Sequence, residues 1–380
     1  MLRMRNRIRK AVEREGAAYY VRLILLSFAA TVALTRLYLT LTGFPQIGNR
    51  TLHISHLLWG GLALFISAIL MTIYANRWVY TLGSILAGFG VGLFIDEVGK
   101  FITRTNDYFY PPAAPIIYIL FLLVVLLYLE VRHPPRHDAR SELYRAFDTL
   151  QEVLDRDLDA HERTDLRNRL ARIVELNEDP DLTRLAKDLQ VFLKSATTVS
   201  TGDNWVERII QKWEMLEDKW LTVERLKLTV IIGLVTLGLW SLLDLILLIP
   251  GISDALHFQT QLAALIRAHL IIGPRSLTFY LSGVTLKAVC GLIMLSAAGF
   301  LVGHKVKLGV AAGYIGLLLC ISVVSLIEFY FDQFSTILPA IFEFGLLFIL
   351  LDYRIRVHTP PSPPQHKEQP HTHQGERQSD

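Results

Sequence analysis

Residues 113–130 read AAPIIYILFLLVVLLYLE, an almost uninterrupted apolar run whose single charged side chain comes last. About 20 such residues in a helix cross the roughly 30 Å hydrocarbon core of a membrane. Because backbone polar groups find no water there, a run of this length predicts a spanning helix. Seven further apolar runs of similar length lie at 20–41, 54–75, 79–97, 226–249, 279–302, 308–329 and 336–352.

The composition of the whole chain agrees with this interpretation. Of 380 residues, 52% are hydrophobic, and the mean hydropathy is +0.37. These values exclude a soluble globular enzyme and a disordered protein. The two cysteines, Cys290 and Cys320, lie inside apolar runs, which excludes a secreted disulfide scaffold. A net charge of +3 does not indicate a nucleic-acid partner.

The sequence therefore predicts an all-α, polytopic helical membrane protein with about eight transmembrane helices in two four-helix halves. Arg and Lys are concentrated before the first run and between the fourth and fifth, so the positive-inside rule predicts that both termini are cytoplasmic, in a bacterial-type inner membrane. The predicted units are a basic N-terminus (1–19), a first membrane half (20–132), a cytoplasmic helical domain (133–225), a second membrane half (226–356) and a disordered tail (357–380).

The predicted cytoplasmic domain is highly charged and has helical periodicity. Leu166, Leu170 and Ile173, for example, recur at spacings of three and four, which is typical of one buried helix face. We expect a bundle of three or four helices. It is either a module that binds a protein partner or an insertion that joins the two membrane halves.

Ionisable residues gather at one depth of the first half. His53 and His56 begin the second run, while Asp96 and Glu97 end the third, and Asp107 follows in the adjoining loop. Because the second span runs inward and the third outward, these groups are predicted to meet near the extracytoplasmic surface. Charged groups at membrane depth are costly and often functional, so we take all five as candidate catalytic residues.

Two imidazoles and several carboxylates are ligands that transition metals accept, which makes His53, His56 and Asp96 a candidate site for a divalent metal. The same residues suit acid–base chemistry. The alternative is a purely structural role, in which these side chains are solvated, pair with Lys100 or Arg36, or fix the packing of the helices.

The second half carries a different set of ionisable residues. Lys287 lies in the sixth run, Glu328 ends the seventh and Glu343 lies inside the eighth. A Lys287–Glu343 ion pair would offset the cost of burying both charges. A path for protons or ions through Glu328 and Glu343 is the functional alternative.

The segments HISHLLWGG (53–61), GLFIDEVGKFIT (92–103) and NDYF (106–109) together resemble a group of uncharacterised bacterial integral membrane proteins. The resemblance covers roughly residues 50–120. It implies that His53, His56, Asp96, Glu97 and Asp107 matter, and it implies no particular activity.

Three hypotheses follow from the sequence. The first is a metal or acid–base site at the extracytoplasmic ends of spans two and three, acting on a lipid-like or periplasmic substrate. The second is an ion-coupled transporter built from the two four-span halves. The third is a membrane sensor or scaffold that acts through its cytoplasmic helical domain. Membrane lipid is the partner common to all three.

Overall fold

The computed structural model describes residues 11–43, 55–132, 138–155, 160–195, 223–248, 263, 266 and 273–358. Within these ranges the secondary structure is helical, without a strand, which confirms the predicted all-α class. Eight helical stretches are long and apolar enough to cross a membrane, as predicted. Most of the predicted tail lies outside the described residues, so its predicted disorder stays a prediction.

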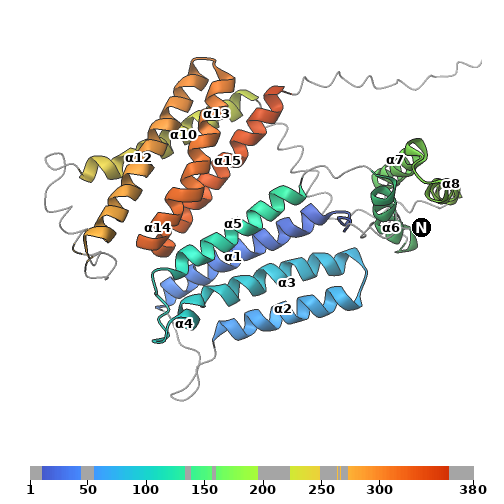
Figure 1. The fold of residues 1–380 in the computed structure, drawn as a ribbon, viewed down its shortest axis with the longest axis horizontal. Helices are drawn as coiled ribbons and strands as arrows, with labels where there is room; N and C mark the ends of the chain where they lie inside the picture. Colours follow the sequence, from blue (N-terminus) through green and yellow to red (C-terminus); the bar gives the residue numbers. More distant parts are fainter. Residues whose placement is uncertain are drawn as a thin grey trace, which may run out of the picture.

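The first half contains α1 (Ala17–Thr42), α2 (His56–Ile73), α3 (Arg77–Asp96) and α5 (Ala113–Val131). Helix α3 packs against both α1 and α2 (Figure 1). The approach to α2 is close because glycines face each other, and a Cβ added at Gly60 would lie 2.8 Å from the carbonyl oxygen of Gly90. Small residues at such crossings are typical of helix packing in membranes.

The second half contains α10 (Val223–Leu248), α12 (Pro274–Val302), α13 (Val306–Leu319), α14 (Ser325–Phe331) and α15 (Ile337–His358). Helix α12 packs against both α10 and α13, around a core that includes Met294 and Leu301. The seventh span is one continuous helix in three parts, because a π-helix at Cys320–Val324 joins α13 to α14. Such π-turns are rare and frequently occur at functional sites.

The two halves meet where α5 packs against α14. The ring of Tyr118 stacks on Phe329 with 4.5 Å between centroids. The Tyr118 hydroxyl also donates a hydrogen bond of 2.6 Å to the carbonyl of Ile321, inside the π-helix. A side chain of the first half is therefore bonded to the irregular turn of the second.

The insert between the halves forms three described helices, α6 (Ala139–Asp155), α7 (Ala160–Leu176) and α8 (Pro180–Ser195), which agrees with the predicted bundle. Leu166, Leu170 and Ile173 lie in its core. Its α7 is tied to the start of α3, where Arg77 and Glu162 approach to 2.9 Å. The insert therefore contacts α3 at the end opposite to Asp96.

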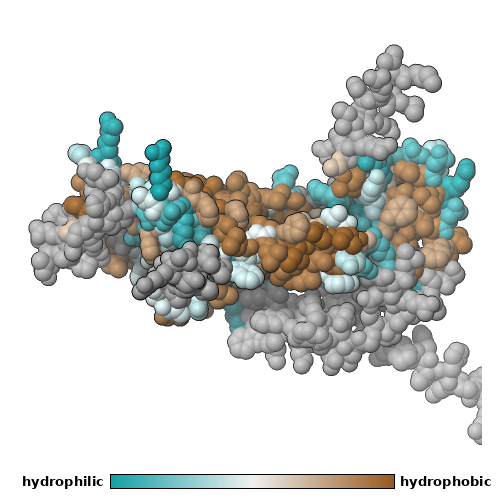
Figure 2. Space-filling model, turned by 90° about the horizontal axis from the view of Figure 1, so that it is seen from below, coloured by the Kyte–Doolittle hydropathy of each residue, from teal (hydrophilic) through white to brown (hydrophobic). Residues whose placement is uncertain are grey.

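The surface of the spans fits a lipid environment. Large apolar side chains such as Leu34, Leu123 and Phe342 are more than half exposed. Figure 2 shows hydrophobic residues over the middle of the visible face and hydrophilic residues toward its two sides. This pattern, with eight apolar helices, is that of an integral, multi-pass membrane protein.

Candidate functional site

A cluster of ionisable side chains lies where α1, the start of α2, the end of α3 and the loop after α4 (Val98–Ile102) come together. We refer to it as the polar cluster. Its members are Arg36, Ser55, His56, Asp96, Glu97, Lys100 and Tyr108.

The most buried contact of the polar cluster joins Arg36 to Asp96. The Nε of Arg36 lies 2.5 Å from Oδ1 of Asp96, and its second guanidinium nitrogen donates 2.9 Å to the backbone carbonyl of the same residue. Arg36 is 4% exposed and Asp96 1% exposed. Neither charge can reach bulk water, so each depends on the other for its stabilisation.

His56 lies between two carboxylates. Its Nε2 is 3.1 Å from Oδ2 of Asp96, and its Nδ1 is 3.0 Å from Oε1 of Glu97. An imidazole donates through both nitrogens only when it is doubly protonated, whereas the neutral ring would face one carboxylate with a lone pair. The geometry therefore suits an imidazolium that shares its protons with two acceptors.

Further donors form hydrogen bonds or ion pairs with the two carboxylates. The Tyr108 hydroxyl donates 2.6 Å to Oδ2 of Asp96, and the Ser55 hydroxyl donates to Oε2 of Glu97. The ammonium of Lys100 lies 3.3 Å from Oε1 of Glu97. Burial, reinforced by the neighbouring Asp96 carboxylate, raises the pKa of Tyr108 well above its ordinary value, so this hydroxyl stays a donor.

The structure brings three of the five predicted candidates together, namely His56, Asp96 and Glu97. Asp107 is exposed, and its carboxylate accepts a hydrogen bond from the backbone N–H of Phe109 in its own loop. His53 lies outside the described residues. The prediction that Asp107 belongs with the other carboxylates therefore has no support in these contacts.

Sequence reasoning considered Arg36 and Lys100 only as structural partners, and it did not include Ser55. The signals were nonetheless present. Arg36 is a strong base inside an apolar run, and Ser55 directly precedes the helix that it caps, accepting 3.1 Å from the backbone N–H of Leu57.

The donor set of the polar cluster does not favour a divalent metal. Both oxygens of Asp96 already accept from Arg36, His56 and Tyr108, and the charges of Arg36 and Lys100 would repel a cation. Among the described residues, no group of three or more His, Cys, Asp and Glu side chains is arranged to hold a metal. A metal site that includes His53 stays a prediction.

The second half contains a separate buried polar group. Glu343 is 5% exposed, and its carboxyl oxygens lie 3.0 Å from the Cys320 thiol and 2.9 Å from the Ser325 hydroxyl, at the two ends of the π-helix. Lys287 forms a short ion pair with Glu328, at 2.6 Å, and its charge also acts on Glu343, the partner that the sequence suggested.

Comparison with known proteins adds no name to either group: no family model, curated protein or solved structure matches this chain. The resemblance to uncharacterised bacterial membrane proteins therefore stays a prediction.

Proposed function

We propose that the polar cluster is an acid–base site, at the extracytoplasmic ends of the second and third spans, that acts on a lipid-like substrate. The observation that carries this proposal is the position of His56 between two buried carboxylates. Histidine is a common general acid or base, and the two carboxylates fix the orientation of this ring.

The charge arrangement suits proton transfer. Arg36 and Lys100 place two positive charges beside the carboxyl groups of Asp96 and Glu97. The side chain of His56 is 25% exposed, while those of Asp96 and Glu97 are almost fully buried. His56 is thus the member of the trio that a substrate can reach, and the carboxylates act through it as positioning residues.

The proposed orientation rests on the charges and on the insert. The basic N-terminus and the charged α6–α8 bundle belong on the cytoplasmic side of a bacterial-type inner membrane by the positive-inside rule. Because α7 is tied to the Arg77 end of α3, the Asp96 end would face the extracytoplasmic side. A periplasmic or outer-leaflet substrate then has access to the polar cluster.

This function is tested by lipid chemistry in vesicles. The protein is reconstituted into liposomes of phosphatidylethanolamine and phosphatidylglycerol, and lipid products are followed by mass spectrometry. Turnover is expected with the wild type and should fall by about 10² or more in His56→Asn, since general acid–base catalysis contributes roughly that much. His304→Asn, which changes an exposed histidine outside the polar cluster, should keep the wild-type rate. An unchanged lipid profile with wild-type protein would contradict the enzymatic hypothesis.

An ion-coupled transporter is the second candidate, and the hydrogen bonds around Glu343 favour it. The Ser325 hydroxyl lies 3.1 Å from the Cys320 carbonyl as well as 2.9 Å from Glu343, but it has one proton. When it donates to the carbonyl, it can only accept from a protonated Glu343. Buried carboxyls that can carry a proton are typical of proton relays in membranes.

Proton flux distinguishes this candidate from the first. In liposomes loaded with a pH-sensitive dye, a transporter should conduct protons when a membrane potential is applied, and Glu343→Gln should reduce that flux at least tenfold. Asp352→Asn, on the same helix and paired with Arg356, is the matched control. His56→Asn should leave the flux unchanged. Wild-type flux in Glu343→Gln would rule out a proton path through this residue.

A further inference from the structure

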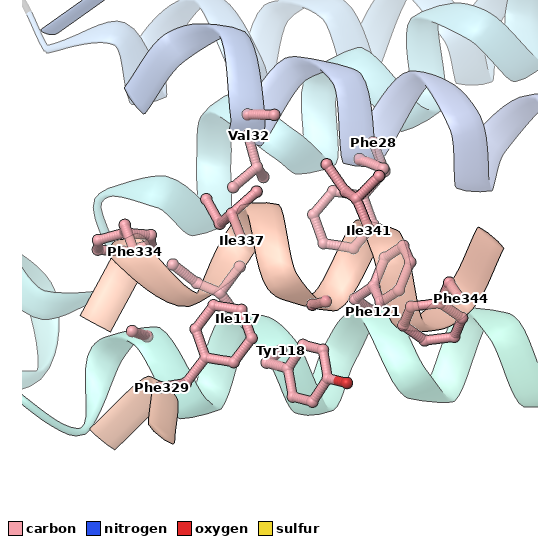
Figure 3. A pocket seen from close by; sticks show the side chains of 14 residues that line it. Phe28, Val32, Ile117, Tyr118, Phe121, Phe329, Phe334, Ile337, Ile341 and Phe344 are labelled. Atoms are coloured by element: carbon pink, nitrogen blue, oxygen red, sulfur yellow. The ribbon is translucent and has the colours of Figure 1, made fainter. Parts of the chain in front are cut away.

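A cavity of about 100 Å³ lies between the two membrane halves (Figure 3). Its walls come from α1 and α5 of the first half and from α14, α15 and the short segment between them in the second. The labelled lining residues are Phe28, Val32, Ile117, Tyr118, Phe121, Phe329, Phe334, Ile337, Ile341 and Phe344.

The cavity offers a ligand almost nothing but hydrocarbon. Among the described residues that line it, Tyr118 alone has a polar side-chain atom, and that hydroxyl already donates to Ile321. Water needs two to four polar partners, so apolar cavities of this kind stay dry and accept apolar ligands. An apolar cavity half as large again, of about 150 Å³, binds benzene, so this cavity has room for a segment of a few carbon atoms.

The cavity is accessible from the surface of the spans. Ile341 lines it and is 55% exposed, and Ala33 on the facing helix is half-buried. Both residues belong to helices that are apolar enough to cross a membrane. The medium outside this opening is therefore the acyl chains of the bilayer.

One end of the cavity adjoins the polar cluster. Phe334 and Phe344 lie toward opposite ends of the view in Figure 3. The guanidinium of Arg36 lies 3.5 Å from the centroid of the Phe334 ring, and the same guanidinium pairs with Asp96. The apolar cavity and the polar cluster therefore adjoin at Phe334. A membrane lipid has the same sequence of parts, an apolar chain joined to a polar headgroup.

We propose that this cavity binds a segment of one acyl chain of a membrane lipid, with the headgroup directed toward the polar cluster. The inference extends the proposed function by making an acyl lipid the substrate class. Binding of the chain is measured separately from turnover, so labelling can succeed even if the lipid-product experiment fails.

The test uses phosphatidylglycerol with a photoactivatable diazirine in the middle of one chain. The full-length protein is equilibrated with this lipid in vesicles, extracted, washed in detergent to remove loosely bound lipid, irradiated and mapped by peptide mass spectrometry. The lining residues Ala33 and Ile337 should keep their label. Their outward-facing neighbours Leu34 and Leu338 are 63% and 62% exposed. After the detergent wash, the labelling of these two residues should be at least several-fold lower than without the wash.

Filling the cavity provides the second arm. Ala33→Phe should reduce labelling of Ile337 at least several-fold, whereas Leu34→Phe, one residue along on the exposed face, should not. Ala29→Leu is a smaller filling change at the same wall should Ala33→Phe fail to fold. Label confined to Leu34 and Leu338, or label on Ile337 that survives filling, would overturn the proposal.

Discussion

Replacing Asp96 with alanine is expected to lower the free energy of unfolding by about 3–5 kcal/mol, the usual cost of removing one partner of a buried ion pair. The reason is the neighbour that remains. Arg36 is 4% exposed, and it would keep its charge without the carboxylate that lies 2.5 Å from its Nε. Thermal or denaturant unfolding in a single detergent, followed by circular dichroism, measures the loss.

Two controls distinguish the loss of the ion pair from a general loss of stability when residues of this region are mutated. Asp107→Ala removes an exposed carboxylate close in sequence and should change stability by no more than about 0.5 kcal/mol. The double variant Arg36→Met/Asp96→Leu should recover part of the loss, because it removes the unpaired Arg36 charge, whereas Tyr108 and His56 still lose Asp96 as their acceptor. A loss below about 1 kcal/mol for Asp96→Ala alone would mean that Arg36 finds water or another partner.

A methyl group added to Gly60 is expected to separate α2 from α3, at a cost of about 1–3 kcal/mol for overpacking. The Cβ of Gly60→Ala would lie 2.8 Å from the Gly90 carbonyl oxygen and 2.8 Å from the Phe94 nitrogen. Both are backbone atoms, so no side-chain rotation relieves the contact. Because His56 begins the same helix, the variant should also weaken the polar cluster.

The adjacent glycine is a matched control. A Cβ at Gly61 meets nothing within 4 Å, and alanine is the better helix former, so Gly61→Ala should be neutral or stabilising by up to about 1 kcal/mol. The two single variants are compared by melting temperature in the same detergent. Equal melting temperatures would show that α2 and α3 do not pack as closely as the structure describes.

The predictable parts of this molecule were those governed by local pattern and depth. Long apolar runs determine the spans. His56 begins the second span and Asp96 ends the third, so the two residues lie at the same depth. Sequence does not say which helices are neighbours. Arg36 was therefore one possible partner among others in the sequence, and the packing of α1 against α3 is what brings it to Asp96.

The ion pair between Lys287 and Glu328 has a similar origin. An additional residue in a helical turn rotates everything after it by about 100° relative to what came before, and the π-helix at Cys320–Val324 lies directly before Glu328. The register that brings Glu328 to Lys287 therefore depends on an irregularity that periodicity does not reveal.

Helix α3 also has a mechanical consequence. Its first residue, Arg77, is hydrogen-bonded to Glu162 in α7 of the insert, and its last, Asp96, is held by Arg36 and His56. At 1.5 Å per residue this helix is a stiff rod of roughly 30 Å. A displacement of the Arg77 end of α3 would therefore move its Asp96 end as well, and with it the distance between His56 and the carboxylates that it contacts.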